Sequence, residues 1–186
     1  NYKMHKFTGP GTFTVCEVGP GSPSQTDEVS YVVVAGGGGG AGAGGGAGGF
    51  REGKNSCDPY ADSPLDSGTA ITVTATAYPI TVGAGGAGGN AWNPGARVTD
   101  GNDSIFSTIT STAGGLGGWN GPSTPAGGDG GSGGGAGNGG AGSGTVGSGD
   151  TPPTPVAQGF DGGLSSPGPG ANVGFGAGGG ASAVGT

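Results

Sequence analysis

Short stretches rich in β-branched residues alternate with glycine tracts along the chain. The stretch at 27–35, DEVSYVVVA, predicts a strand, and its unbroken valine run predicts burial on both faces. The stretch at 70–77, AITVTATA, alternates apolar residues with threonine, which is typical of a half-buried strand. Shorter strands are expected at 80–82 and 104–110. No window combines a helical period with capping residues, so we expect essentially no α-helix.

The N-terminal stretch MHKFTGPGTFTVCEV has two β-rich arms. They cover residues 4–8 and 12–18 and flank Gly9-Pro10-Gly11. Proline fixes one φ angle and the glycines permit unusual ones, so this sequence is typical of a tight turn. We therefore expect a hairpin or a sharp corner here.

Glycine makes up a large share of the chain, with 54 glycines and 14 prolines among 186 residues. Such a composition is typical of a low-complexity linker. However, alanine interrupts the tracts more often than serine and charged residues are sparse, whereas disordered chains are usually rich in serine, lysine and glutamate. Each predicted strand also leads directly into a glycine tract. We therefore interpret the tracts as ordered structure.

The longest tract has a period of three residues. The stretch at 127–144 reads GGDGGSGGGAGNGGAGSG, and its third places hold Asp129, Ser132, Asn138 and Ala141 while the others are nearly all glycine. Three residues per turn is the period of the polyproline II helix, which has no internal hydrogen bonds. Its backbone groups therefore need partners on neighbouring segments. Glycine on two of three faces allows such helices, here polyglycine II helices, to pack backbone against backbone.

These patterns predict an all-β fold in which a small N-terminal β-sandwich merges into packed polyglycine II helices. Because few apolar side chains are available for burial, backbone hydrogen bonds of about 1 kcal/mol each must supply much of the stability. We expect a single domain with strand-rich parts and glycine-rich layers. The domain covers residues 1–186, with strands in 1–35 and 70–110 and glycine layers in 36–49, 83–89, 113–118 and 127–186.

The charge balance argues against nucleic acid as a partner. Five lysines and arginines stand against twelve aspartates and glutamates, a net charge of 5 − 12 = −7, which is the opposite of the basic surface that phosphate backbones require. No stretch approaches the about 20 apolar residues that cross a bilayer, so no membrane insertion is expected. The start, NYKMHKF, has neither an export signal nor an initiating methionine. We expect a fragment or a processed product of a longer chain.

No set of residues in the sequence indicates catalysis or a cofactor. His5 is the only histidine, and we expect it to be a surface residue of the first strand. The glycine runs do not open a helix and lack the Gly-Lys-Ser/Thr ending of a phosphate-binding loop. The protein is therefore not expected to be an enzyme.

Two groups of residues leave alternatives open. Asp100, Asn102 and Asp103 have the spacing of calcium ligands but lack the downstream glutamate of a full loop, so a turn stabilised by their side chains is the favoured interpretation. Cys16 and Cys57 form either one disulfide or two thiols. They lie too far apart in sequence for a CxxC metal site.

Three glycine-poor loops are candidates for recognition, because loops on a rigid scaffold often carry it. The loop at 51–67, REGKNSCDPYADSPLDS, is charged and aromatic, while NAWNP at 90–94 and WNGPSTP at 119–125 hold the two tryptophans. Aromatic rings beside asparagine and aspartate suit stacking on sugar rings and hydrogen bonding to their hydroxyls. The alternative is that these loops are corner-filling turns. The candidate receptor-binding residues are Arg51, Lys54, Tyr60, Trp92, Asn93, Trp119 and Asn120.

The predicted strands and the glycine tracts follow one another in a characteristic order. HKFTGPGTFTV precedes VSYVVVAGGGGGAGAGGGAGG, which is followed by ITVTATAYPITVGAGGAGG, DSIFSTITSTAGGLGGW, AQGFDGG and GFGAGGGASAVG. In this order the chain resembles the glycine-rich domain of bacteriophage tail-fibre and other virion structural proteins. The resemblance covers nearly the whole chain. It departs at the C-terminus, where family members commonly continue into another apolar strand and this sequence ends at Thr186.

The resemblance implies a virion structural protein of the tail-fibre or adhesin type, located on the extracellular virion surface. Related phage adhesins fold their glycine tracts into a layered polyglycine II sandwich with variable loops at one end. Such a protein would display loops for host recognition on a rigid scaffold. The implied partners are other virion proteins, a host-surface glycan or outer-membrane protein, and further copies of the chain, a trimer being one arrangement.

Other classes remain open for this sequence. A capsid decoration or head-fibre protein would use the loops to bind the capsid shell, and an extracellular glycine-rich filament subunit would self-associate into long polymers. An ice-binding protein is disfavoured, because ice binding needs small residues that repeat on one plane. Asp129, Ser132 and Asn138 are expected to be too hydrated and too varied for that role.

Overall fold

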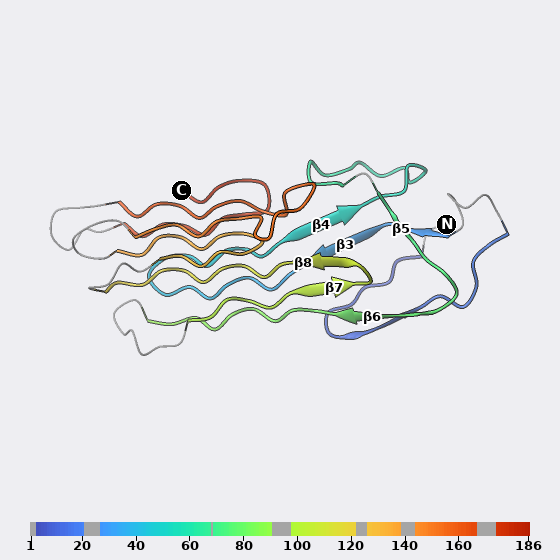
Figure 1. The fold of residues 1–186 in the computed structure, drawn as a ribbon, viewed down its shortest axis with the longest axis horizontal. Coiled ribbons are helices and arrows are strands. Elements are labelled where there is room, and N and C mark those ends of the chain that lie inside the picture. The colour runs from blue at the N-terminus through green and yellow to red at the C-terminus, as the bar shows by residue number, and fades with distance from the viewer. Residues whose placement is uncertain are drawn as a thin grey trace.

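The computed structural model describes residues 3–20, 27–67, 69–90, 98–121, 126–138, 144–166 and 174–186. Within these residues there are short strands and extended segments but no α-helix, so the predicted all-β fold is confirmed. Figure 1 shows the strands gathered at one end of the molecule, here the strand end, and glycine segments running side by side to the opposite end, here the distal end. The strands are β1 (Gly11–Thr14), β2 (Glu28–Val29), β3 (Tyr31–Val34), β4 (Phe50–Gly53), β5 (Ile71–Thr72), β6 (Ala77–Thr81), β7 (Ser104–Phe106) and β8 (Ile109–Ser111).

The described strands form antiparallel sheets around a small aromatic core. The largest sheet has the order β1-β6-β7-β8, while β2 pairs with β5 and β3 pairs with β4. Tyr31, Val33 and Phe106 are the buried residues of this core. The ring of Phe106 makes edge-to-face contacts with Phe13, Tyr31 and Tyr78. The core is small, because most of the chain has no side chain to contribute.

The predicted strand at 27–35 is divided between two sheets. β2 pairs with β5, and after Ser30 the chain continues as β3, which pairs with β4. The prediction that the valine run is buried on both faces is wrong. Val33 points into the core at 9% exposure, whereas Val32 and Val34 are 56% and 51% exposed. The run follows ordinary strand alternation because only one face of β3 is covered.

Other predicted strands also have different boundaries. The stretch at 70–77 contributes β5 and the first residue of β6, and β6 continues through Pro79. The stretch at 104–110 is the hairpin of β7 and β8, which turns at Ser107 with a φ of 53°. The N-terminal arm at 4–8 is not a strand, since β1 pairs with β6 instead. His5 is therefore outside the strands, with its ring 5.1 Å from that of Phe13.

Backbone hydrogen bonds order the described extended segments into three stacked layers, here the glycine lattice. The outer layer contains, in spatial order, segments 83–89, 35–40, 43–49, 174–180 and 183–186. The middle layer contains segments 98–103, 112–121, 132–138 and 158–166. The third layer contains segments 126–131 and 144–149. Each layer is bonded to the next, so the lattice extends in two dimensions, unlike a single sheet.

The central segment, 132–138, shows the predicted period of three. The N–H groups of Gly133 and Ala136, three residues apart, both donate to segment 158–166, while Gly134 and Gly135 donate to other neighbours, at 2.8 to 3.0 Å. A partner that recurs at every third residue is what a helix with three residues per turn requires. The carbonyl groups of the central segment accept bonds from segments 112–121, 144–149 and 174–180.

The polar third-place residues occupy different environments. Ser132 is fully buried, and its hydroxyl lies 3.0 Å from the carbonyl oxygen of Gly48 and 3.2 Å from that of Gly180. Asn138 is 5% exposed. Only Asp129 is exposed. The expectation that all three residues are hydrated is therefore wrong, because Ser132 and Asn138 are buried.

Candidate binding surfaces

Segment 112–121 carries Trp119 and Asn120 to the distal end. It begins beside β4, where the N–H of Gly49 donates to the carbonyl oxygen of Thr112 at 2.8 Å, and it runs away from the strands (Figure 1). At about 3.1 Å per residue, the span from Thr112 to Trp119 is roughly 20 Å. Trp119 and Asn120 are both half-buried.

The other predicted pair, Trp92 and Asn93, lies outside the described residues. The described residues on either side of this pair reach the distal end. Gly89 donates to the carbonyl oxygen of Gly40 at 2.9 Å, at the end of the parallel segment 35–40. The chain then returns through Thr99, whose N–H donates to the carbonyl oxygen of Ala87 at 3.2 Å.

Further segments lead to the same end of the molecule. Segments 132–138 and 158–166 run parallel to 112–121, from the strand end to the distal end. The lattice bonds of these segments hold the positions at which the chain reaches the distal end. The described segments that start at the distal end and return are 43–49, 98–103, 126–131, 144–149 and 174–180.

The loop after β4 lies at the strand end (Figure 1) and is tied down at its base. Glu52 is 5% exposed and accepts a hydrogen bond from the hydroxyl of Ser63. The N–H and the hydroxyl of Ser67 donate to the carbonyl oxygen of Glu52 at 3.0 and 2.9 Å. Asn55 is 8% exposed, and its N–H donates to the hydroxyl of Ser30 at 2.9 Å. These contacts give the loop one defined path over β4.

Two predicted recognition residues of this loop, Lys54 and Tyr60, come together in the structure. Lys54 forms an ion pair with Asp62 and lies 5.0 Å from the ring centroid of Tyr60. The hydrogen bond with Asp62 raises the pKa of Lys54, and burial raises the pKa of Tyr60, so at neutral pH Lys54 is a cation and Tyr60 is a neutral phenol. Tyr60 is 45% exposed. Arg51 is half-buried on β4, on the opposite face from Glu52.

The predicted recognition residues therefore do not form one site. Lys54 and Tyr60 belong to the strand end, whereas Trp119 and Asn120 belong to the distal end. With segment 112–121 between them, one ligand of ordinary size cannot contact both groups.

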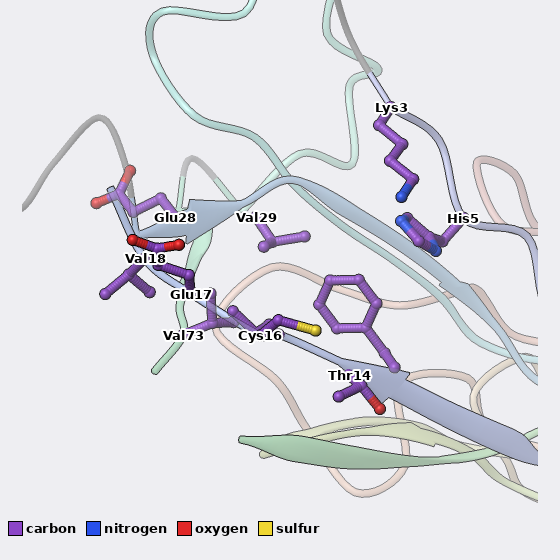
Figure 2. Close-up of a pocket in the computed structure, with 11 residues that line it drawn as sticks. Lys3, His5, Thr14, Cys16, Glu17, Val18, Glu28, Val29 and Val73 are labelled. Carbon is purple, nitrogen blue, oxygen red and sulfur yellow. The ribbon is translucent and has the colours of Figure 1, made fainter. Parts of the chain in front are cut away.

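A hollow of about 420 Å³ lies at the strand end (Figure 2). Phe13, Val29 and Val73 supply apolar surface, Lys3 and His5 line one side, and Glu17 and Glu28 line the other. Figure 2 shows the amine of Lys3 directed toward the ring of His5. Within the described part of the chain, no group of three or more His, Cys, Asp or Glu side chains is arranged to hold a metal ion.

Cys16 and Cys57 are not joined in the structure. Both side chains are exposed, and Cys16 lines the hollow beside Phe13. Of the two alternatives, the structure has thiols and not the disulfide.

The side chains of Asp100 and Asp103 do not form the turn that is the favoured interpretation of the sequence, because each bonds to a residue 10 or 16 positions further along the chain. The carboxylate of Asp100 accepts the N–H of Leu116 at 2.7 Å, and that of Asp103 accepts the N–H of Ala113 at 2.8 Å. The two aspartates are three residues apart, and the two N–H groups that they accept are also three residues apart. Both spacings equal the three-residue repeat of the glycine lattice. Asn102 takes part through its backbone, since its carbonyl oxygen accepts the N–H of Gly36 at 3.0 Å. These aspartates replace backbone acceptors at the edge of the lattice.

Calcium is expected to leave the stability unchanged, and Asp100→Ala is expected to lower it by about 1 kcal/mol. The alanine variant leaves the N–H of Leu116 without its acceptor at an exposed site. Asp100→Asn keeps an acceptor oxygen and is expected to lose less than half of that amount. Thermal unfolding followed by circular dichroism, with calcium and with chelator, measures each effect. A clear rise in melting temperature with calcium would show that the metal interpretation is correct.

Gln158 is a buried polar residue that the sequence patterns did not single out. It has 0% exposure, and its side-chain carbonyl accepts the N–H of Thr112 at 2.8 Å. Its amide nitrogen lies 3.1 Å from the hydroxyl of Thr112 and 3.3 Å from the carbonyl oxygen of Pro152. It joins the strands to the glycine lattice where β8 ends. Its only signal in the sequence is a long polar side chain directly before the GFDGG tract.

The lattice of glycine segments agrees with the family comparison. The family model described as a glycine-rich domain matches residues 11–186. The chain belongs to this glycine-rich domain family. Comparisons with curated proteins and with solved structures found no match. In the described residues of this family member, no helix is long and apolar enough to span a membrane.

Proposed function

We propose that this glycine-rich domain protein is a phage virion structural protein, a tail-fibre or adhesin-type component that displays loops for host-surface recognition. The observation that carries the proposal is the convergence of segments 35–40, 83–89, 112–121, 132–138 and 158–166 on the distal end. Lattice hydrogen bonds hold each of these five described segments. Loops on a rigid scaffold are frequent recognition sites, and a preorganised surface loses less entropy on binding.

Trp119 and Asn120 are the described residues through which the distal end would recognise a host surface. An indole ring stacks on the apolar face of a sugar, and a carboxamide bonds its hydroxyls, so the pair suits a glycan or a polar loop of an outer-membrane protein. The strand end, which lies opposite, would then face the other virion proteins. The protein would act on the extracellular surface of the virion.

Binding of the purified, fluorescently labelled protein to whole cells of susceptible hosts tests the proposal. The variant Trp119→Ala/Asn120→Ala is expected to bind roughly tenfold more weakly or worse, as truncated anchor residues do. The matched control Lys54→Ala/Tyr60→Ala changes two residues at the strand end and is expected to bind as the unmodified protein does. Circular dichroism checks that all three proteins are folded.

Other outcomes would identify another function or another site. If the control loses binding and the Trp119 variant keeps it, the recognition site is the loop after β4. If the folded protein binds no susceptible host, the adhesin proposal is wrong, and a capsid decoration or head-fibre protein, or a glycine-rich filament subunit, becomes the better explanation.

A further inference from the structure

The outer layer of the glycine lattice contains glycines at which an added side chain would meet less overlap than at most other glycines of the lattice. A Cβ atom on Gly85 would lie 3.7 Å from the nearest atom, and one on Gly88, Gly37 or Gly40 would lie 3.3, 3.3 and 3.2 Å away. None of these residues has a positive φ that would favour glycine. In the middle and third layers, by contrast, a Cβ on any glycine from Gly127 to Gly137 would come within 2.7 Å of another atom, as would one on Gly101 or Gly114.

These four glycines line grooves between neighbouring segments. The nearest atoms to a Cβ on Gly85 and Gly88 are the carbonyl oxygens of Gly37 and Gly40, so these two glycines line the groove between segments 83–89 and 35–40. Gly37 and Gly40 in turn face segment 43–49. At these four positions, therefore, no side chain fills the space between the segments.

Backbone donors also remain open at these positions. Within the described residues, the N–H groups of Gly37, Gly40, Gly85 and Gly88 donate no hydrogen bond. Gly37 and Gly40 are three residues apart, and so are Gly85 and Gly88. In the central segment, the two N–H groups that donate to segment 158–166 have the same spacing of three residues. The outer face thus continues the bonding pattern of the lattice but has no next layer.

The charges of the lattice lie elsewhere. The carboxylates of Asp100, Asp103, Asp129 and Asp161 belong to segments of the middle and third layers and accept N–H groups there. The exposed residues of the outer layer are glycine and alanine, with Val184 at its end, Val34 at the start of segment 35–40 and Thr186 at the C-terminus. The described residues of the outer layer therefore include no charged side chain, although the chain as a whole carries a net charge of −7.

We propose that the outer face, formed by segments 83–89, 35–40, 43–49, 174–180 and 183–186, is the interface with a second copy of this chain. The middle layer packs against one side of the outer-layer segments and forms hydrogen bonds with them. The grooves and the open N–H groups on the opposite side could accept another polyglycine II layer in the same way. A second copy supplies such a layer with the same period. The two outer faces would meet across a two-fold axis, each filling the grooves of the other.

The size of the face agrees with this occupant. Segments of about seven residues at about 3.1 Å per residue, lying side by side at about 5 Å, cover roughly 500 Å². The exposed Val32 and Val34 belong to β3, which leads directly into segment 35–40. With these valines, the area of the face approaches the value that each partner of a stable dimer buries, which is about 800 Å². An uncharged contact between two acidic chains also avoids placing like charges against each other.

Sedimentation velocity over a range of concentrations tests the interface, with Ala47→Glu/Gly85→Glu as the disrupting variant. Both positions are exposed, and a Cβ fits at each, so the added carboxylates reach the outer face without disturbing the fold. The matched control Thr110→Glu/Thr145→Glu adds the same charge at exposed positions outside this layer. We expect the unmodified protein and the control to sediment as dimers and the disrupting variant to sediment as a monomer with an unchanged circular dichroism spectrum.

Three outcomes would overturn the proposal. One is an unmodified protein that is monomeric at every concentration, which would leave the outer face for a different partner. The second is a dimer that persists in the disrupting variant, and the third is a trimer. The test does not depend on the proposed host recognition, since it uses the purified protein alone.

Discussion

Replacing Gly134 with alanine is expected to prevent the glycine lattice from forming. A Cβ at this position would lie 1.8 Å from the carbonyl oxygen of Leu116. That oxygen cannot move away freely, because it accepts the N–H of Gly128 at 2.8 Å. Relief of the overlap would displace the central segment, 132–138, which is bonded on every side. We expect a loss of more than about 4 kcal/mol in the free energy of unfolding, measured by urea denaturation with circular dichroism.

Gly85→Ala is the matched control for this substitution. Its Cβ would lie 3.7 Å from the carbonyl oxygen of Gly37, which is an ordinary contact. Alanine also restricts the unfolded chain, so the variant is expected to be as stable as the unmodified protein or more stable by about 0.5 kcal/mol. If Gly134→Ala were equally harmless, close backbone packing would not be the reason for the glycine content.

The period of three could be predicted from the sequence because it appears in residue types. Asp129, Ser132 and Asn138 recur at multiples of three in a glycine background, and the central segment has the hydrogen-bond pattern that this spacing implies. The environment of each third place could not be predicted. Whether a third place faces solvent, as at Asp129, or the lattice, as at Ser132, depends on which segments lie beside it.

The order and direction of the segments have no signal in the sequence. Glycine offers the same backbone groups to any neighbour, so nothing in segment 112–121 specifies its contact with 132–138 and not with another tract. The separation of Tyr60 from Trp119 follows from this order. The loops that hold these residues could be recognised from their composition, but their positions at opposite ends of the molecule depend on the number of lattice segments between them.

The spacing of Asp100 and Asp103 shows how one pattern supports two interpretations. Two aspartates three residues apart are typical of calcium loops, and they also match a lattice with a three-residue repeat. In the structure each carboxylate accepts one N–H group, that of Leu116 or of Ala113, which favours the lattice interpretation. In a glycine-rich chain, therefore, acidic residues at this spacing indicate lattice edges as readily as metal ligands.

Gln158→Met is expected to lower the free energy of unfolding by about 2 to 4 kcal/mol. Methionine has a similar length and fills the same space, but it cannot accept the N–H of Thr112 or donate to the carbonyl oxygen of Pro152. Both groups would be left without their present partners in a site where Gln158 has 0% exposure, and each such loss costs about 1 to 3 kcal/mol. Urea denaturation followed by tryptophan fluorescence and circular dichroism measures the change.

Leu164→Gln is the control for this variant, because Leu164 is 70% exposed and its replacement is expected to change stability by less than about 0.5 kcal/mol. A Gln158→Met variant as stable as this control would mean that water or a shifted backbone replaces the lost bonds. A large loss with the volume preserved would instead show that hydrogen bonding holds the junction of the strands and the lattice. That result is expected, because Gly49, which meets Thr112 at this junction, has no side chain that could supply replacement bonds.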